Sequence, residues 1–412
     1  MRQLHRRPFP NQPARPSAAA RAARWAVALL ALIVAVAGPV SASPTASTCG
    51  TTTWTSTWNT APAYAPTLGP WANQTLRMVA RTSLGGTQLR IHLTDVYSSQ
   101  PAQIGHVTVG TQLNGSTTVE TTPAVVTFGG SEAVTIPAGG EAVSDPVTFT
   151  VAPGTRLLIS LFIPAGANLA QAPRHDVAAN TEYNYVGGDV AASQAFTPTN
   201  TFGFTTLLNG VDVSTTGAQT VVAVGDSITD GVGTGTDTDT RWPNYLADRV
   251  AASGLAVIDQ GISGNWVTQD EGASGPSLLN RFQHDVLDQP GIKDIIDADG
   301  TNDLRGGVTA ATLEQAQASI VASAHAANVR ILLATITPCA GDSKCTPAVE
   351  TQRQAYNTWV RGGSSAADGF VDPDAAVRAG TAIAAPFDSG DHLHLNSAGN
   401  EELANSIDLS LL

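Results

Sequence analysis

The chain is poor in lysine and in charged residues generally. Of its 412 residues 13% are charged, and the only lysines are Lys293 and Lys344. Acidic residues outnumber basic ones by 34 to 21, which gives a formal net charge of -13. A protein that binds nucleic acid or an anionic membrane surface needs clustered Lys and Arg. The composition therefore argues against both kinds of partner.

The sequence has no shortage of apolar residues, so it does not have the composition of a disordered protein. Hydrophobic residues make up 42% of the sequence, enough to build buried cores. A chain of 412 residues is long for a single core, so we expect two domains plus ancillary segments.

Cysteine is scarce, with three residues. Cys339 and Cys345 flank a short polar stretch, CAGDSKC, and we expect them to form a disulfide, with two unpaired thiols as the alternative. Cys49 is left over, and its surroundings lack the apolar residues of a lipoprotein acylation site. No His or Asp pattern makes any of the three a nucleophile or a metal ligand. The sequence predicts no metal site and no cofactor.

The first 42 residues have the pattern of an export signal. Arginines precede a short apolar run from Trp25 to Val40, and small residues follow it up to Ala42. The run is shorter than the roughly 20 residues that a membrane-spanning helix needs, so an uncleaved anchor is the weaker alternative. We predict a signal peptide over 1–42, a linker over 43–53, and a secreted protein without membrane insertion after cleavage. The pair Arg6-Arg7 leaves the choice between Sec and Tat export open.

Residues 54–215 have the texture of an antiparallel β domain. Short runs rich in Val, Thr and Ile alternate in part with polar residues and are separated by Gly, Pro, Asn and Asp. This spacing of strands predicts a β-sandwich with a jelly-roll-like topology.

Residues 216–412 alternate instead between apolar strands and longer helical patterns, which predicts a parallel α/β sheet with right-handed crossovers. The expected strands are 221–224, 255–259, 293–299 and 329–335, and the expected helices are 242–253, 277–287, 311–327, 350–361 and 398–409.

Four short polar motifs lie where these strands end or helices begin. They are Gly225-Asp226-Ser227, GISGN at 261–265, GTND at 300–303 and DHLHLN at 391–396. In a parallel sheet such positions share the carboxyl edge, where α/β proteins place their chemistry. The motifs are therefore expected to form one site.

With these motifs, residues 221–412 resemble an SGNH hydrolase of the GDSL esterase/lipase superfamily. The resemblance implies a flavodoxin-like three-layer α/β/α fold. It also implies the roles of five residues, namely Ser227 as nucleophile, His394 as base, Asp391 as the acid of the triad, and Gly264 and Asn302 as oxyanion donors together with the Ser227 backbone. The β domain resembles the non-catalytic domain that precedes the hydrolase in a group of secreted carbohydrate-esterase-like members.

The residue chemistry agrees with these roles. A serine hydroxyl needs an adjacent base, and a carboxylate beside the imidazole holds its tautomer and stabilises its charged form. His392 directly follows Asp391 and should point elsewhere. Because no G-x-S-x-G elbow is present, the α/β-hydrolase plan is disfavoured.

Asp226 and Asp303 are expected to brace the loops of the site without transferring protons. Asp297 and Asp299 in a buried strand would be costly, so Asp299 indicates either such a brace or a misplaced strand. Asp237 and Asp239 in TDTDTR lack the Gly and distal Glu of a calcium loop, which predicts a solvated loop at the rim of the cleft.

These observations predict a secreted serine esterase that cleaves carboxylic esters through an acyl-enzyme. The β domain favours acetylated polysaccharide as the substrate, since large substrates benefit from an added binding surface. A lipase or arylesterase that acts on small or lipid esters is the first alternative. An inactive carbohydrate-binding protein is the second.

Overall fold

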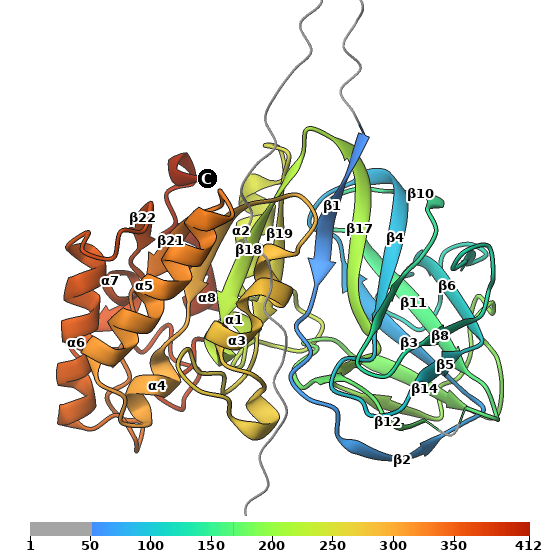
Figure 1. Ribbon diagram of the computed structural model, residues 1–412, viewed down its shortest axis with the longest axis horizontal. Helices are drawn as coiled ribbons and strands as arrows, with labels where there is room; N and C mark the ends of the chain where they lie inside the picture. The colour runs from blue at the N-terminus through green and yellow to red at the C-terminus, as the bar shows by residue number, and fades with distance from the viewer. Residues whose placement is uncertain (1–51, 168) are drawn as a thin grey trace, which may run out of the picture. The chain divides into compact units, whose positions relative to one another are not determined.

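The computed structural model describes residues 52–167 and 169–412, which lie in one compact unit, Gly50–Leu412 (Figure 1). The predicted signal peptide, most of the predicted linker and Cys49 lie outside the described residues. Within the described ranges, none of the helices combines the length and the apolar character that crossing a membrane requires.

The N-terminal half contains two larger antiparallel sheets. The first has the order β1-β17-β4-β10, with β9 also paired to β4, and the second has the order β15-β14-β3-β11-β6-β7. The strands of the first sheet are β1 (Thr52–Asn59), β4 (Gly86–Thr94), β9 (Glu141–Val143), β10 (Val147–Val151) and β17 (Leu208–Thr216). Those of the second are β3 (Gln74–Arg81), β6 (His106–Thr111), β7 (Ala124–Val126), β11 (Arg156–Ile163), β14 (Glu182–Val186) and β15 (Asn200–Phe202).

Three two-stranded pairs accompany these sheets, and all three are antiparallel. They are β2 (Thr67–Trp71) with β12 (Leu169–Gln171), β5 (Ala102–Ile104) with β8 (Val134–Ile136), and β13 (Arg174–His175) with β16 (Thr205–Thr206).

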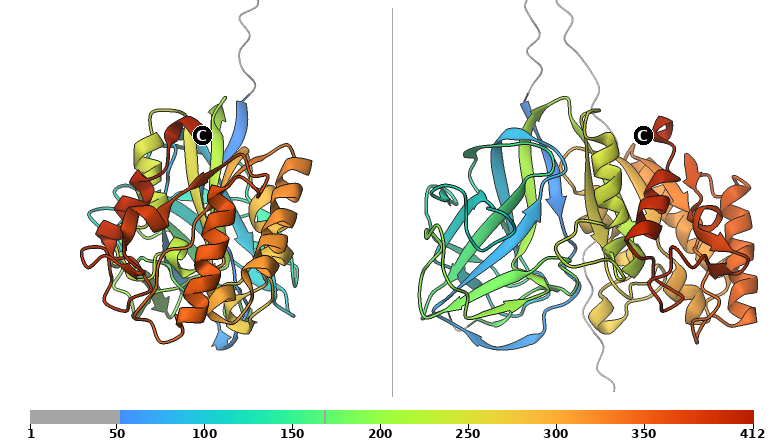
Figure 2. Two further views of the ribbon diagram at one scale, coloured as in Figure 1. Left: turned by 90° about the vertical axis from the view of Figure 1, so that its left-hand side faces the viewer. Right: turned by 180° about the vertical axis from the view of Figure 1, so that it is seen from behind.

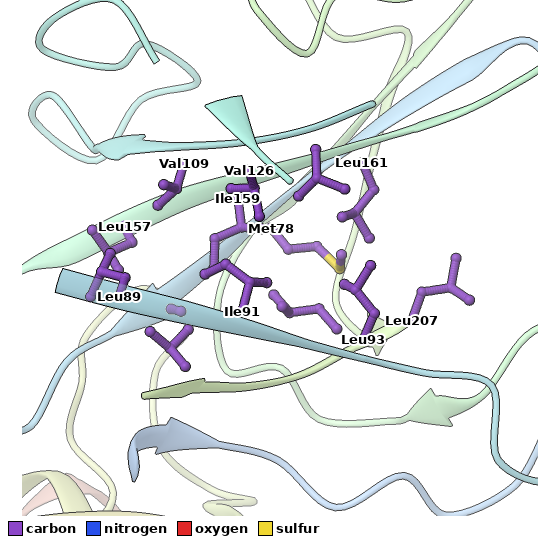
Figure 3. Close-up of a cluster of buried hydrophobic side chains, with 14 of the residues drawn as sticks. Met78, Leu89, Ile91, Leu93, Val109, Val126, Leu157, Ile159, Leu161 and Leu207 are labelled. Carbon is purple, nitrogen blue, oxygen red and sulfur yellow. The ribbon is translucent and has the colours of Figure 1, made fainter. Parts of the chain in front are cut away.

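One apolar core receives side chains from both larger sheets (Figure 3). Alternate residues of β4 enter it from the first sheet, and β3 and β11 contribute from the second; the labelled members include Met78, Leu89, Ile91, Leu93, Leu157, Ile159 and Leu161. Burial of a Leu or Ile side chain stabilises a fold by roughly 1.5–3 kcal/mol. Because successive side chains of a strand point to opposite faces, the alternation of apolar and polar residues determines which face of each strand is buried.

The C-terminal half contains a parallel sheet with the order β19-β18-β20-β21-β22. Its strands are β18 (Gln219–Gly225), β19 (Leu255–Gly261), β20 (Ile292–Ala298), β21 (Arg330–Ala334) and β22 (Gly369–Val371). Numbered from β18, the order is 2-1-3-4-5, as in flavodoxin-like sheets. The parallel sheet and its first four strands are confirmed, whereas β22 was not predicted because three residues carry too short a pattern.

Helices cover both faces of this sheet. Val221 and Ala223 of β18 enter one apolar cluster, and Val222 and Val224 enter another. The first cluster includes residues of α2 (Trp242–Val250), α7 (Pro373–Val377) and α8 (Ser397–Asn405), and Figure 2 shows the yellow-green α2 beside the red α8. The second includes residues of α3 (Leu278–Arg281), the π-helical turn Phe282–Leu287, α5 (Ala310–Ala326) and α6 (Pro347–Arg361).

Short elements complete this half. The helices α1 (Ser227–Asp230) and α4 (Thr301–Arg305) begin just after β18 and β20, and β23 (Arg378–Ala379) pairs with β24 (Ala382–Ile383). The antiparallel part ends with β17, and β18 starts the parallel sheet after two intervening residues.

Polar contacts join the two halves along β19, the edge strand that neighbours β1. The side-chain amide of Gln260 donates to Asn59 Oδ1 at 2.8 Å, and the Val257 amide donates to Ser83 Oγ at 3.0 Å. The division into domains at residues 215 and 216 stays a prediction.

Candidate active site

Ser227 lies at the carboxyl end of β18, at the start of α1. Asp226 caps this helix, because its Oδ1 accepts a hydrogen bond from the Ile228 amide at 2.9 Å. The strand, cap and helix N-terminus together hold the serine at the edge of the sheet. The sequence predicted this position.

Ser227, His394 and Asp391 are in hydrogen-bond contact. The distance from Ser227 Oγ to His394 Nε2 is 2.8 Å, and that from His394 Nδ1 to Asp391 Oδ2 is 2.6 Å. An ionised carboxylate can only accept hydrogen bonds, so Nδ1 carries a hydrogen and donates a hydrogen bond to Asp391. In a neutral imidazole, Nε2 is then the acceptor that faces the serine hydroxyl.

The loop that carries Asp391 stabilises its charged form. The carboxylate accepts bonds from the amides of Leu393 and His394, at 3.0 and 2.9 Å. Partial burial opposes ionisation, but the hydrogen bonds from His394 outweigh it and hold the pKa of Asp391 well below its ordinary value. His392, as expected, points elsewhere, with Nδ1 2.7 Å from Asp388 Oδ2.

The two predicted oxyanion residues follow the neighbouring strands. Gly264 comes three residues after β19 and has φ = 80°, a left-handed conformation that favours glycine. Asn302 lies in the first turn of α4, and its Nδ2 donates to the carbonyl of Asn265 at 2.9 Å. The loops of Ser227 and Gly264 are tied together, because the Ile262 amide donates to the Gly225 carbonyl at 3.0 Å.

Asp226, Asp299 and Asp303 are buried. Asp303 accepts bonds from the amides of Val267 and Thr268, at 2.8 and 3.0 Å, and so holds the segment that follows Gly264. Asp299 lies just after the end of β20 and accepts from the Gly300 amide at 2.8 Å. Burial raises the pKa of Asp226 to about 6 and that of Asp299 well above its ordinary value.

Asp297, inside β20, gives a testable dependence of stability on pH. Burial raises the pKa of its carboxyl to about 7, so the folded protein holds a proton that the unfolded chain releases near pH 4. This stability is present below pH 4 and is lost as the pH rises through about 7. Asp297→Asn should therefore raise the free energy of unfolding near pH 8 by on the order of 1 to 4 kcal/mol.

Urea unfolding of this variant and the parent across the pH range measures the effect. The gain should shrink toward zero as the pH falls below about 4, because the parent carboxyl then becomes protonated in the unfolded state as well. Glu132→Gln at the exposed Glu132 is the matched control and should leave the profile unchanged. A gain independent of pH would contradict the assignment.

His175, which the sequence analysis missed, reaches this site from β13 of the antiparallel half. Its Nε2 lies 3.0 Å from Asp230 Oδ1, and Nδ1 lies 2.9 Å from the carbonyl of Ala61. The two side chains are 5% and 1% exposed. Both ring nitrogens face acceptors, so both must donate and the ring is an imidazolium. Burial alone would lower the pKa of His175, but the Asp230 carboxylate raises it above its ordinary value.

Asp230 connects this imidazolium to the oxyanion loop. It ends α1, three residues after the serine, and its Oδ2 accepts a bond from the Ser263 amide at 2.9 Å. Ser263 directly precedes Gly264. No local pattern could have indicated the pair, because His175 and Asp230 are 55 residues apart.

The acidic loop 236–241 is exposed at residues 236–238, as expected, but its two carboxylates also form hydrogen bonds to the antiparallel half. Asp237 accepts from the Thr181 amide at 2.7 Å and from the Thr181 hydroxyl at 2.6 Å. Asp239 accepts from Arg156 Nη1 at 2.6 Å. These partners belong to the antiparallel half, whose position the sequence alone does not give.

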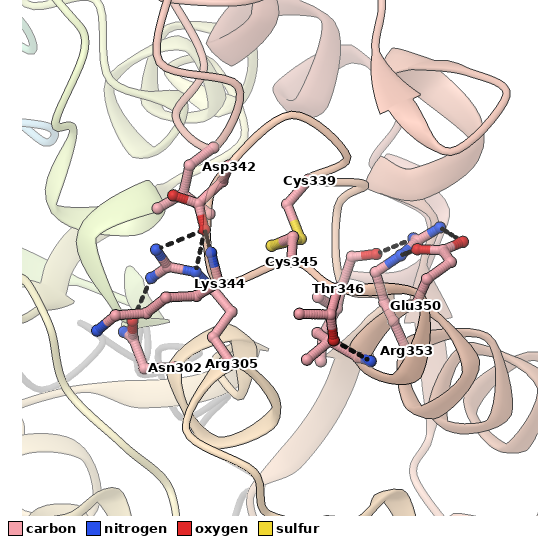
Figure 4. The surroundings of a disulfide bond; sticks show 12 residues. Asn302, Arg305, Cys339, Asp342, Lys344, Cys345, Thr346, Glu350 and Arg353 are labelled. Atoms are coloured by element: carbon pink, nitrogen blue, oxygen red, sulfur yellow. Dashed lines mark hydrogen bonds and ion pairs between the residues drawn. A yellow bond between two sulfur atoms is a disulfide. The ribbon is translucent and has the colours of Figure 1, made fainter.

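The predicted disulfide between Cys339 and Cys345 is confirmed, with the two sulfur atoms 2.05 Å apart (Figure 4). The loop that it closes lies next to the site, since Asp342 within it contacts Arg305 of α4.

A serine, a histidine and an aspartate joined by hydrogen bonds at the carboxyl edge of a parallel sheet are the arrangement of serine hydrolases. The sequence matches the GDSL-like Lipase/Acylhydrolase family over residues 223–402. This part of the chain is similar to that family, and the match supports an ester hydrolase.

Solved structures with similar folds include three esterases. The M. Smegmatis aryl esterase is 20% identical, with 46% of this chain and 96% of that one covered and a TM-score of 0.37. A mutant acetyl-xylooligosaccharide esterase from Geobacillus Stearmophilus is 23% identical, with 46% and 91% of the two chains covered and a TM-score of 0.37. A carbohydrate acetylesterase from Sinorhizobium meliloti is 17% identical, with 46% and 95% covered and a TM-score of 0.36. No curated protein matches the sequence.

Proposed function

We propose that the protein is a secreted serine esterase that removes acyl groups, chiefly acetyl groups, from carbohydrate. The continuous hydrogen bonds from Asp391 through His394 to Ser227 carry this proposal. The export signal predicted over residues 1–42 and the disulfide support secretion, because disulfides persist in oxidising compartments.

In the acylation step, His394 Nε2 takes the proton of Ser227 as Oγ attacks the ester carbonyl carbon. The imidazolium that forms keeps its Nδ1 proton and donates a hydrogen bond from it to the carboxylate of Asp391, which stays ionised. Nε2 then gives its proton to the leaving alcohol, and the acyl group remains on Oγ. Water, activated by the same imidazole, releases the carboxylic acid and restores the serine.

The negative oxygen of each tetrahedral intermediate needs fixed donors. The backbone N–H groups of Ser227 and Gly264 and the second N–H of the Asn302 amide serve this purpose. Loss of one such donor costs roughly 3 kcal/mol of transition-state stabilisation. No cofactor takes part.

An open site supports a bulky substrate. The side chain of Asp391 is 50% exposed and that of His394 is 14% exposed, so the catalytic loop lies at the surface. A lipase active on long acyl chains would need an apolar channel for the chain.

The antiparallel half, which we interpret as a jelly-roll-like β-sandwich, provides the added binding surface. A hollow of about 250 Å³ lies between it and the loop after α1, with a lining that includes Asp176, Asn180, Gly233 and Thr234. A Cβ built on Gly233 would come within 3.2 Å of His394 Cβ, so the hollow adjoins the catalytic loop. Polar groups of this kind can bind sugar hydroxyls.

Aromatic side chains stand beside the hollow. The hydroxyl of Tyr64 donates to Asp176 Oδ2 at 3.1 Å, and the guanidinium of Arg174 lies 4.1 Å from the centroid of the Phe204 ring. Aromatic rings pack against the C–H faces of sugar rings, while neighbouring charged groups bind the hydroxyls. Tyr64 is the most direct probe of this surface because it is half-buried and next to the lining.

The proposal predicts a split between substrates. Release of acetate from acetylated xylan and hydrolysis of p-nitrophenyl esters of increasing chain length are measured with the parent and Tyr64→Ala. The variant should show a roughly tenfold higher KM for acetylated xylan, as expected for loss of an aromatic contact. Its kinetics on p-nitrophenyl acetate should not change, because that substrate has no sugar ring to pack against Tyr64.

Rates that rise steadily with acyl chain length in the parent would favour a lipase instead. No hydrolysis of any ester would favour an inactive carbohydrate-binding protein.

A further inference from the structure

The amide of Asn302 is held at both ends. Nδ2 donates one hydrogen to the carbonyl of Asn265 at 2.9 Å, and Oδ1 accepts from Arg305 Nη1 at 3.2 Å. A guanidinium can only donate hydrogen bonds, so it pairs with Oδ1. If the amide flipped, the guanidinium would face the NH₂ group, which is also a donor, and the hydrogen bond would be lost. Arg305 therefore fixes the orientation that leaves the second N–H of Asn302 free.

Arg305 is held in turn by Asp342 (Figure 4). Its Nε and Nη2 donate to Asp342 Oδ1 at 3.1 and 2.9 Å, and the two side chains are 13% and 16% exposed. Partial burial opposes ionisation of the carboxyl, but the bond from Arg305 outweighs it and lowers the pKa of Asp342 below its ordinary value. The pair is charged at neutral pH and largely shielded from solvent.

The disulfide loop holds Asp342. The Asp342 amide donates to the Cys339 carbonyl at 3.1 Å, and the Cys345 amide donates to the Asp342 carbonyl at 3.1 Å, so both bonds lie inside the loop that the disulfide closes. The loop also contacts the segment of the catalytic histidine, because a Cβ built on Gly341 would come within 2.7 Å of His392 Cγ.

We propose that Arg305 and Asp342 are positioning residues for the oxyanion donor Asn302, and that the Cys339–Cys345 disulfide keeps Asp342 in place. The inference rests on the function proposed above, because it needs Asn302 to stabilise the oxyanion. The positive charge of Arg305 on Oδ1 also polarises the amide, which makes its free N–H a stronger donor. Both effects act in the transition state and should change kcat more than KM.

A double-mutant cycle tests the proposal with p-nitrophenyl acetate. Arg305→Met and Asp342→Asn should each lower kcat by about tenfold with KM within twofold, since the loss is bounded by the roughly 10²–10³-fold effect of removing the donor itself. In an Asn302→Ala background the same changes should have almost no further effect, because the amide that they position is absent.

Controls keep the outcomes distinct. Arg330→Met breaks another ion pair, with Asp294 at 2.7 Å, and should leave kcat unchanged. Thermal midpoints identify variants that fold poorly. Asp342→Asn keeps an acceptor oxygen and should disturb folding less than Arg305→Met. Reduction of the disulfide by dithiothreitol should lower kcat severalfold in the parent but not in the Asn302→Ala variant.

Equal losses in both backgrounds would show a general structural role and overturn the inference. So would full activity of Arg305→Met and Asp342→Asn while Asn302→Ala is impaired. Full activity of Asn302→Ala would instead contradict the proposed function.

Discussion

Ser227→Ala should reduce kcat for p-nitrophenyl acetate by about 10⁴- to 10⁶-fold. The serine oxygen is the atom that becomes acylated, and residues that act as one catalytic unit lose nearly all their effect when one is removed. What remains should come from the oxyanion donors and from substrate binding. The measurement is a steady-state rate with purified protein, together with covalent labelling by a fluorophosphonate.

The parent should be labelled at Ser227, and the variant should not. Ser319→Ala is the matched control, since Ser319 is an exposed serine of α5 whose hydroxyl donates to the carbonyl of Gln315 within the same helix, at 3.0 Å. It should keep full activity. A Ser227→Ala enzyme as fast as the parent would refute the proposed mechanism.

Asp391→Asn should lower kcat by about 10²- to 10⁴-fold, with little effect on KM. The carboxylate accepts from Nδ1 and so directs the basic Nε2 toward Ser227. An amide can donate to Nδ1 instead, which places the proton on Nε2 and removes the base. The lower end of the range applies if water replaces part of the lost charge at this half-exposed position.

Asp388→Asn is a closely matched control. Asp388 Oδ2 lies 2.7 Å from His392 Nδ1, so the same loop contains a second Asp-His pair that does not contact the serine. Its kcat should stay within about twofold of the parent. Equal losses in Asp388→Asn and Asp391→Asn would indicate damage to the loop and count against a specific role of Asp391.

The sequence allowed prediction of those parts of the site that depend on local pattern. Ser227, Gly264 and Asn302 each follow a parallel strand, and the order of strands alone brings their loops to one edge. Asp391 and His394 could be paired because they are three residues apart on one turn. The disulfide could be predicted from the same kind of short separation.

Contacts between distant residues that belong to no recognisable motif could not be predicted. Arg305 looks like an ordinary basic residue in the last turn of a short helix, and its role depends on Asp342, 37 residues later. The docking of Asp237 onto Thr181 depends on how two differently built halves meet. Such pairs leave no periodic signal, since each partner is a common surface residue type until folding brings the two together.

The buried pair of His175 and Asp230 is an obstacle to producing the C-terminal half of this enzyme without the antiparallel half. Excision of residues 216–412 as a minimal enzyme would remove the counter-cation and leave a carboxylate, 1% exposed in the intact chain, beside the helix of the nucleophile. An unpaired charge of that kind must gain water or a proton, and either change shifts the amide of Ser263. A graft onto another binding module would meet the same obstacle unless the new neighbour also supplied a cation at this point.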